Sequence, residues 1–195
     1  DNIVLHSSLN KGIHYMAKYT MDMVLEYAKV FEENRDMGND SSAGKKIVKH
    51  GGQYVVNAYF TDEAQVEQLL SEGLDPKPLG YDRIKEGSDF GIGKYIKCAR
   101  MHDHKMTFAD KKGKETEVDF GGSPKVVNFT NGVENKSWWD MTDDGELGNG
   151  TSAKVQFETY SNGAGVRLLA IGVTDHVAWE STSGPSADDE MFKVG

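Results

Sequence analysis

Cysteine, long apolar runs and an excess of positive charge are all absent or nearly absent from this chain of 195 residues. Cys98 is its only cysteine, which excludes an internal disulfide and suits a reducing compartment. No apolar run approaches the roughly 20 residues that a bilayer-spanning helix needs, so no membrane partner is expected. The formal net charge of −9 argues against a protein that binds nucleic acid over its whole surface.

The charges are nevertheless unevenly placed along the chain. Residues 91–130 hold eight basic and five acidic residues, so this segment alone carries a net charge of +3. Acidic residues concentrate in two later segments, 140–146 and 188–190. Because affinity for phosphate depends on the local surface, a basic groove is compatible with an acidic total charge.

Alternating polar and apolar residues predict short strands through most of the chain. We expect strands at 54–60, 94–101, 116–120, 125–130, 152–160 and 166–177, with a polar turn at 110–114 linking the second to the third. A short helix is expected between the first two, with Thr61 as its N-cap and an end before Gly73. Residues 35–52, rich in Gly, Asn, Asp and Ser, are expected to form a long loop. The pattern predicts a mainly β protein, a small barrel with one short helix and long loops.

Two segments near the start are less distinct. Residues 1–20 carry little periodicity and are expected to be an N-terminal arm. Residues 21–34 read MDMVLEYAKVFEEN, whose Met, Leu, Glu and Ala content favours a helix, while its apolar positions fit a strand about equally well. On the residues alone, both structures stay open for this segment.

The stretch 148–168, GNGTSAKVQFETYSNGAGVRL, is rich in glycine. A phosphate-binding loop would need Gly-Lys-Ser/Thr at the start of a helix, but no lysine precedes Thr151 and the following residues alternate as in a strand. Ser161, Asn162 and Gly163 tolerate positive φ, so we predict a hairpin whose first strand is half-buried.

Three groups of reactive side chains favour structural roles. His102 and His104 would share one face of a strand, as two metal ligands would, but no third ligand stands at a recognisable spacing. Cys98, inside a predicted strand, is expected to be a buried thiol and not a nucleophile. Adjacent acids such as Asp143 and Asp144 are expected to be solvated loop residues. No catalytic site, metal or cofactor is predicted.

Aromatic and basic residues are more informative, because single-stranded nucleic acid is held by rings that stack on bases and by cations that follow the phosphates. Tyr95 and Lys97 share one face of their predicted strand, whereas Arg100 lies on the opposite face. Lys154 shares the polar face of its strand with Tyr160, which stands beside a glycine turn. These residues are candidates for contact with nucleic acid.

Two further sets of side chains depend on whether their segments are extended. Trp138 and Trp139 would then point to opposite faces, so that both can hardly be in the core. A tryptophan packed under the neighbouring loop is the structural alternative. Tyr27, Lys29 and Phe31 would form one further line of rings and charge.

Four segments follow one another in a distinctive order: QYVVNAYFTDEAQVEQL, GKYIKCAR, SPKVVNFTNG and LGNGTSAKVQFETYSNGAGVRLLAIGVTDHVAWE. In the last, LGNGT at 147–151 is followed by Lys154, Val155 and Phe157, then by a glycine turn and a long apolar strand. This order resembles the single-stranded-DNA-binding proteins of tailed bacteriophages. The resemblance covers about residues 24–180, and it is most specific from 147 onward.

The resemblance implies an OB-fold, a five-stranded barrel, that coats single-stranded DNA without sequence preference during phage replication and recombination in the host cytoplasm. Catalysis and cofactors are not implied. It also implies that residues 24–31 are the first barrel strand, within a domain at 21–182. Lys97 falls on the family's basic strand and Tyr160 on its later aromatic position, so they are the first candidates for phosphate contact and base stacking. The full set of DNA-binding candidates is Lys97, Tyr160, Lys154, Arg100, Trp138, Trp139, Tyr95, Lys29 and Phe31.

Members of that family commonly end in an acidic tail closed by an aromatic residue, which recruits replication proteins and competes with DNA. Here the expected tail at 183–195 has only three acids, at 188–190, and Phe192 is followed by three more residues. This end departs from the family's pattern. A homodimer is a further expectation from the resemblance.

Two other functions are weighed against DNA binding. A β-rich structural or carbohydrate-binding module would use exposed aromatics such as Trp138 and Trp139 to stack on sugar rings. A nuclease on the same scaffold would need acidic residues arranged around a metal, and no such spacing is found in the sequence.

Overall fold

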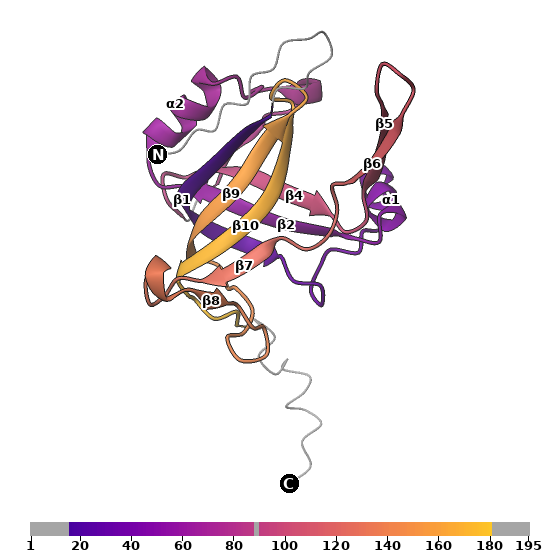
Figure 1. The fold of residues 1–195 in the computed structure, drawn as a ribbon. Helices are drawn as coiled ribbons and strands as arrows, with labels where there is room; N and C mark the ends of the chain where they lie inside the picture. Colours follow the sequence, from indigo (N-terminus) through magenta and orange to yellow (C-terminus); the bar gives the residue numbers. More distant parts are fainter. Residues whose placement is uncertain (1–15, 88–89, 181–195) are drawn as a thin grey trace.

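The computed structural model describes residues 16–87 and 90–180 (Figure 1). In chain order the strands and helices are β1 (Ala17–Lys29), α1 (Ser42–Lys49), β2 (Gln53–Phe60), α2 (Glu63–Ser71), β3 (Ile84–Glu86), β4 (Lys94–Met101), β5 (Lys105–Ala109), β6 (Glu115–Asp119), β7 (Lys125–Asn128), β8 (Ser137–Trp138), β9 (Ser152–Tyr160) and β10 (Gly165–Asp175). Two single 3₁₀ turns, η1 (Pro78–Gly80) and η2 (Val133–Asn135), lie in the connections. The protein is therefore mainly β, as its alternating pattern predicts.

Eight of these strands form one large sheet in the order β3-β4-β2-β1-β9-β10-β7-β8. A further parallel pairing, between Arg167 and Ala99, joins β10 to β4 although three strands separate them in that order. Strands β5 and β6 form a separate two-stranded sheet, and Figure 1 shows this hairpin projecting from the main body.

Strand β1 shows why this segment is extended and not helical. Every second residue from 17 to 25 is buried, while the residues between them face outward. A helix would distribute a pattern of period 2 around its whole circumference, whereas a strand places it on one side. Complete burial of one large apolar side chain contributes about 1.5–3 kcal/mol, so the buried side of β1 favours the strand strongly. Met23 and Leu25 share this core with Phe157 of β9 and with Leu168 and Ile171 of β10.

The start and end of β1 differ from expectation. The strand begins at Ala17, so residues 17–20, expected to belong to an arm, are part of the sheet. It ends at Lys29, after a break in the register with β2 between Glu26 and Lys29. The rest of the arm, residues 1–15, lies outside the described residues, as does the acidic tail at 183–195.

Both helices refine the sequence-based expectation. Helix α2 is capped by Asp62 and not by Thr61, because the Asp62 carboxylate accepts the Ala64 N–H and the Gln65 side chain reaches back to the Asp62 N–H. Helix α1 lies inside the segment expected to be a loop. Its sequence offers only two large apolar residues, Ile47 and Val48, too few to form a stripe at helical spacing.

The turn at 110–114 also has a different place from the one expected. It joins β5 to β6 and not β4 to β6, because Lys105–Ala109 forms a strand that the sequence reading missed. The Asp110 carboxylate accepts the N–H groups of Lys112 and Lys114 and shapes this turn. Among the helices that the structure describes, none is long and apolar enough to cross a membrane.

Candidate nucleic-acid interface

One outward surface of the large sheet collects polar, basic and aromatic side chains from three neighbouring strands, and we name it the β1–β2–β4 face. Directly paired residues on neighbouring strands point to the same side, so the register defines its rows. The rows are Val24–Tyr59–Tyr95, Glu26–Asn57–Lys97 and Lys29–Val55–Ala99. The residues between them along each strand, including Leu25, Ala58 and Ile96, point into the core.

Two lysines give the β1–β2–β4 face positive charge that is available to a ligand. Lys29 and Lys97 are exposed, and neither ammonium group forms an ion pair with another described residue. Both lysines act on the charge of Asp36. Burial raises the pKa of this carboxyl, but hydrogen bonds from Gly38 and Gln53 and the charges of Lys29 and Lys97 outweigh it, so the pKa is lowered. Asp36 therefore stays ionised and partly balances the two lysines.

The aromatic part of this face is built around Tyr59, which is buried beneath its neighbours. The Tyr95 ring lies 5.0 Å from the Tyr59 ring, and Phe90 approaches Tyr59 edge-on at 5.5 Å between centroids. The Tyr59 hydroxyl donates to Glu26 at 3.1 Å, and the Asn57 side-chain amide donates to the same oxygen at 3.3 Å. Tyr95 is thereby held half-exposed on a supported platform, next to Lys97 along β4.

The margin of the face is shaped by the bulge in β1. Tyr27 adopts a φ of 50°, a conformation unfavourable for a bulky residue, and its side chain is exposed. The Asn149 side-chain oxygen accepts the Tyr27 N–H at 2.8 Å, and the Gly150 N–H donates to Leu25 at 2.9 Å. The glycine-rich segment 148–151 thus stabilises the bulge that displays Tyr27.

The same segment also contacts the residues that follow β10. The Gly148 N–H donates to the carbonyl oxygen of Val177 at 2.7 Å, and a side chain at Gly148 would collide with the backbone of Ala178. The buried hydroxyl of Thr151 bonds to Gly148 at 2.8 Å and to Val177 at 3.1 Å. The glycines therefore permit close backbone contact between distant segments, and they do not form a phosphate loop.

A second group of side chains surrounds Arg167 of β10. Its guanidinium forms an ion pair with Glu158 of β9, with 2.6 Å between Nε and Oε1. It also lies 4.3 Å from the centre of the Phe120 ring and 5.7 Å from that of Tyr160. Contacts of this kind between a cation and aromatic faces are attractive, so Arg167 is fixed in place.

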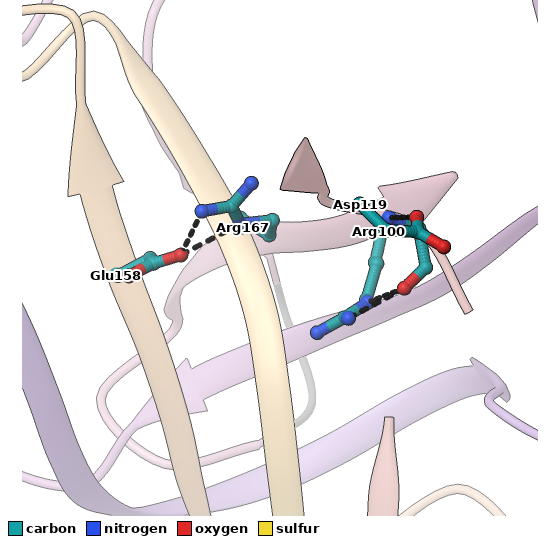
Figure 2. A network of polar contacts seen from close by, with 5 residues as sticks. Arg100, Asp119, Glu158 and Arg167 are labelled. Atoms are coloured by element: carbon teal, nitrogen blue, oxygen red, sulfur yellow. Dashed lines mark hydrogen bonds and ion pairs between the residues drawn. The ribbon is translucent and has the colours of Figure 1, made fainter. Parts of the chain in front are cut away.

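Arg100 lies close to this group but is bound differently. Its Nε donates to the backbone carbonyl of Gly121 at 3.1 Å, and the Gly121 N–H donates to Asp119 (Figure 2). Burial and then the positive charge of Arg167 lower the pKa of Arg100. Arg100 therefore anchors the segment after β6 instead of facing the β1–β2–β4 face, in agreement with the opposite orientations predicted for Arg100 and Lys97.

The nine sequence-based candidates therefore separate into several places. Tyr95, Lys97 and Lys29 come together on the β1–β2–β4 face. Lys154 forms an ion pair with Asp22 at 2.8 Å on the β1–β9 side. Of the remaining candidates, Tyr160 lies exposed beside Arg167, Trp138 lies exposed on β8, and the half-buried Arg100 lies beside Gly121.

Two of the nine candidates are buried, so their placement as stacking residues is corrected. Phe31 is only 9% exposed, because β1 ends at Lys29 and Phe31 lies beyond the strand, where alternation no longer sets its side. Trp139 is also 9% exposed, and its indole N–H donates to Gly145 at 2.8 Å. Trp138 is 71% exposed, which confirms that the adjacent tryptophans point to opposite sides.

Sequence reasoning missed several residues of both groups, namely Asn57, Tyr59, Phe90, Phe120 and Arg167. Strand β2 is apolar on both sides, so nothing in its pattern separates the outward Tyr59 from core residues. Arg167 acquires its role only through contacts with Phe120 and Tyr160, from other strands and loops. Asn57 is the one polar residue within the apolar run 54–60, so it is the one member of these groups that the sequence pattern sets apart.

The reactive side chains occupy structural positions. Burial raises the pKa of the Cys98 thiol to about 12, against a smaller opposite effect of Arg83, which confirms the buried thiol. The Nδ1 atom of His102 lies 2.7 Å from the hydroxyl oxygen of Tyr54, and the ring of His104 stacks on that of His50. Within residues 16–87 and 90–180, no three His, Cys, Asp or Glu side chains are placed to hold a metal ion.

The β1–β2–β4 face therefore combines three features: a supported aromatic ring, two unpaired lysines and an exposed tyrosine on a bulge. Such a surface can stack on a planar group and attract a neighbouring anion. When the chain is compared with known proteins, no family model, no curated protein and no solved structure matches it.

Proposed function

We propose that this protein binds single-stranded DNA without sequence preference, through the β1–β2–β4 face. The carrying observation is that Tyr95 lies beside Lys97 on a face whose lysines have no ion-pair partner among the described residues. An aromatic ring offers stacking to any base, and the lysines attract the phosphates on either side of it. Stacking requires an unpaired base, so the proposed ligand is a single strand and not a duplex.

We further propose that β1, β2, β4, β9 and β10 form an OB-fold barrel. The order β4-β2-β1-β9-β10 and the parallel pairing of Arg167 with Ala99 support this assignment, because that pairing brings the two ends of the series together. An OB-fold binds its ligands across the faces of its second and third strands, which here correspond to β2 and β4. The proposed binding face is on these strands.

The proposed biological role is coating of single-stranded DNA during phage replication and recombination, in the host cytoplasm. The resemblance of residues 147–180 to phage DNA-binding proteins supports this role. The geometry of 148–151 adds a physical reason for that pattern, because it fixes the strand bulge that borders the proposed face.

The proposal is tested by comparing Lys97→Ala with Lys136→Ala, an exposed lysine outside the face. The affinity of each variant for a dye-labelled oligo-dT of about 30 nucleotides is measured by fluorescence anisotropy at several salt concentrations. Lys97→Ala is expected to weaken binding and to reduce the slope of log affinity against log salt by about 0.7, the contribution of one phosphate contact on a single strand. Equal affinities and equal salt slopes for both variants would show that the β1–β2–β4 face does not bind the DNA.

A carbohydrate-binding module is the second candidate, and one observation favours it. Trp138 is 71% exposed beside an open pocket of about 290 Å³ that also includes Phe31 and Pro124. A sugar ring could stack on this tryptophan. Binding that is insensitive to salt, lost in Trp138→Ala and unchanged in Lys97→Ala would support this function over DNA binding.

A further inference from the structure

The β5–β6 hairpin has one apolar and one polar face. Its register places Met106 opposite Val118 and Phe108 opposite Thr116, on one side. The other side carries charged and small polar residues, namely Lys105, Thr107, Glu115, Glu117 and Asp119. Met106 is 45% exposed and Phe108 is 41% exposed, so the apolar side is largely uncovered within the described part of the chain.

This apolar side leads into the group around Arg167. Phe108 meets Phe120 edge-on, with 6.0 Å between ring centres. Phe120 in turn lies against the Arg167 guanidinium, which is next to Tyr160. We name this continuous series Phe108–Phe120–Arg167–Tyr160 the Arg167 ladder.

The Arg167 ladder begins where one row of the β1–β2–β4 face ends. Lys29 pairs with Val55, Val55 pairs with Ala99, and Ala99 pairs with Arg167. These four residues therefore lie side by side across β1, β2, β4 and β10. The two surfaces are continuous through the small side chain of Ala99.

The tip of the hairpin is positively charged. Three lysines, Lys111, Lys112 and Lys114, follow Asp110 in one turn, whose backbone is held by the Asp110 carboxylate. None of the three forms an ion pair with another described residue. The hairpin thus offers aromatic and apolar surface along its side and unpaired positive charge at its end.

We propose that the β5–β6 hairpin forms a second part of the DNA-binding surface. A single strand that crosses the β1–β2–β4 face continues over Ala99 onto the Arg167 ladder, where a base stacks on Phe108 and phosphates approach the tip lysines. Both surfaces combine aromatic rings with unpaired lysines, on the hairpin those of its tip, and this combination suits a polyanion with planar bases. This inference rests on the proposed function and extends the path of the bound strand from the β1–β2–β4 face onto the hairpin.

The length of the bound strand separates the two surfaces experimentally. Binding of dye-labelled oligo-dT of about 6 and about 30 nucleotides is measured for the full chain, for Phe108→Ala and for Lys111→Ala/Lys112→Ala/Lys114→Ala. Phe108→Ala is expected to weaken binding of the long strand about fivefold or more, the effect of one lost base stack, and that of the short strand less than twofold. The triple variant is expected to lower the salt slope for the long strand by about 2.

Two controls keep a folding defect apart from a binding defect. Thr107→Ala alters the neighbouring residue on the opposite side of the hairpin and is expected to bind both strands normally. Phe108→Leu keeps an apolar side chain on the hairpin but removes the ring, so it is expected to weaken the long strand as Phe108→Ala does. Unchanged thermal unfolding of each variant shows that the fold is intact.

The outcomes distinguish this inference from the function on which it rests. If the Phe108 and triple variants bind the long strand normally while Lys97→Ala weakens both strands, the hairpin is not part of the path and the proposed function stands. If Phe108→Ala lowers the affinity for the short and the long strand equally, the hairpin is likewise not a second part of the DNA-binding surface. If the unaltered protein binds neither strand at low salt, the proposed function itself is wrong, and Met106 and Phe108 are better explained as a contact surface for another protein.

Discussion

The side-chain oxygen of Asn149 accepts a hydrogen bond from the backbone N–H of Tyr27 at 2.8 Å, across 122 residues of sequence. Tyr27 is the bulged residue of β1, with a φ of 50°. A positive φ is costly for a side chain with a ring, so the conformation needs support from its surroundings. Asn149 supplies part of that support, and it connects the most specific segment of the sequence to the edge of the β1–β2–β4 face.

Replacing Asn149 tests this connection. Asn149→Ala removes the acceptor and is expected to lower the free energy of unfolding by about 1 kcal/mol, the usual net contribution of one hydrogen bond. Asn149→Asp retains an acceptor oxygen, so its stability is expected to stay close to that of the original protein. Its added negative charge near the proposed DNA path is expected to weaken binding of oligo-dT. Urea unfolding and anisotropy together measure both effects, and equal loss of stability in the two variants would contradict the role of the acceptor.

The adjacent tryptophans are expected to respond in opposite ways. Trp139→Ala leaves a cavity in the core and an unpaired Gly145 carbonyl, so the free energy of unfolding should fall by about 3–5 kcal/mol. Trp138→Ala removes an exposed side chain of β8 and should change stability by less than about 0.5 kcal/mol. Because Trp138 lies outside the β1–β2–β4 face, its removal should also leave affinity for oligo-dT unchanged. A large loss of affinity in Trp138→Ala would move the interface toward β8.

The Cys98 thiol is expected to be unreactive in the folded protein. Its pKa of about 12 leaves almost no thiolate at pH 8, and its burial excludes reagents. A thiol-specific reagent should therefore label the chain only after denaturant is added. Rapid labelling of the native protein would show that β4 opens readily.

His104 is expected to titrate below its ordinary pKa of 6.5. Burial lowers the pKa first, and the charges of His50, Arg167 and Lys46 lower it further, against an opposite effect of Asp119. Since the folded-state pKa lies below the unfolded one, the contribution of His104 to stability is complete above about pH 6.5 and is lost as the pH falls from there through the lower folded-state pKa. NMR titration measures the pKa directly, and a value above 6.5 would contradict the arrangement around His104.

The sequence predicts those elements best whose apolar residues are buried in the core. β2 and β4 are found within one residue of their expected bounds, and the hairpin β9–β10 is found with its turn. Helix α1 is missed because it buries only Gly44 and so leaves no apolar stripe. Local pattern therefore identifies an element most readily where the element contributes to the core.

The candidate site is predictable to a smaller extent. Tyr95 and Lys97 share a face because both belong to one regular strand, which period-2 reasoning captures. Phe31 is assigned to the wrong side because β1 ends at Lys29, two residues earlier than expected, and no local residue type marks that end. Arg167 is not predicted for a different reason, since the aromatic rings that it contacts come from segments that only the fold brings together.

The most direct test of the account is an anisotropy titration with an unstructured oligo-dT of about 30 nucleotides and with a duplex of equal length, each at two salt concentrations. If the β1–β2–β4 face binds single-stranded DNA, the single strand binds tightly and more weakly as salt rises, and the duplex binds far more weakly. No binding of the single strand at low salt, or equal binding of both forms, would contradict the proposal.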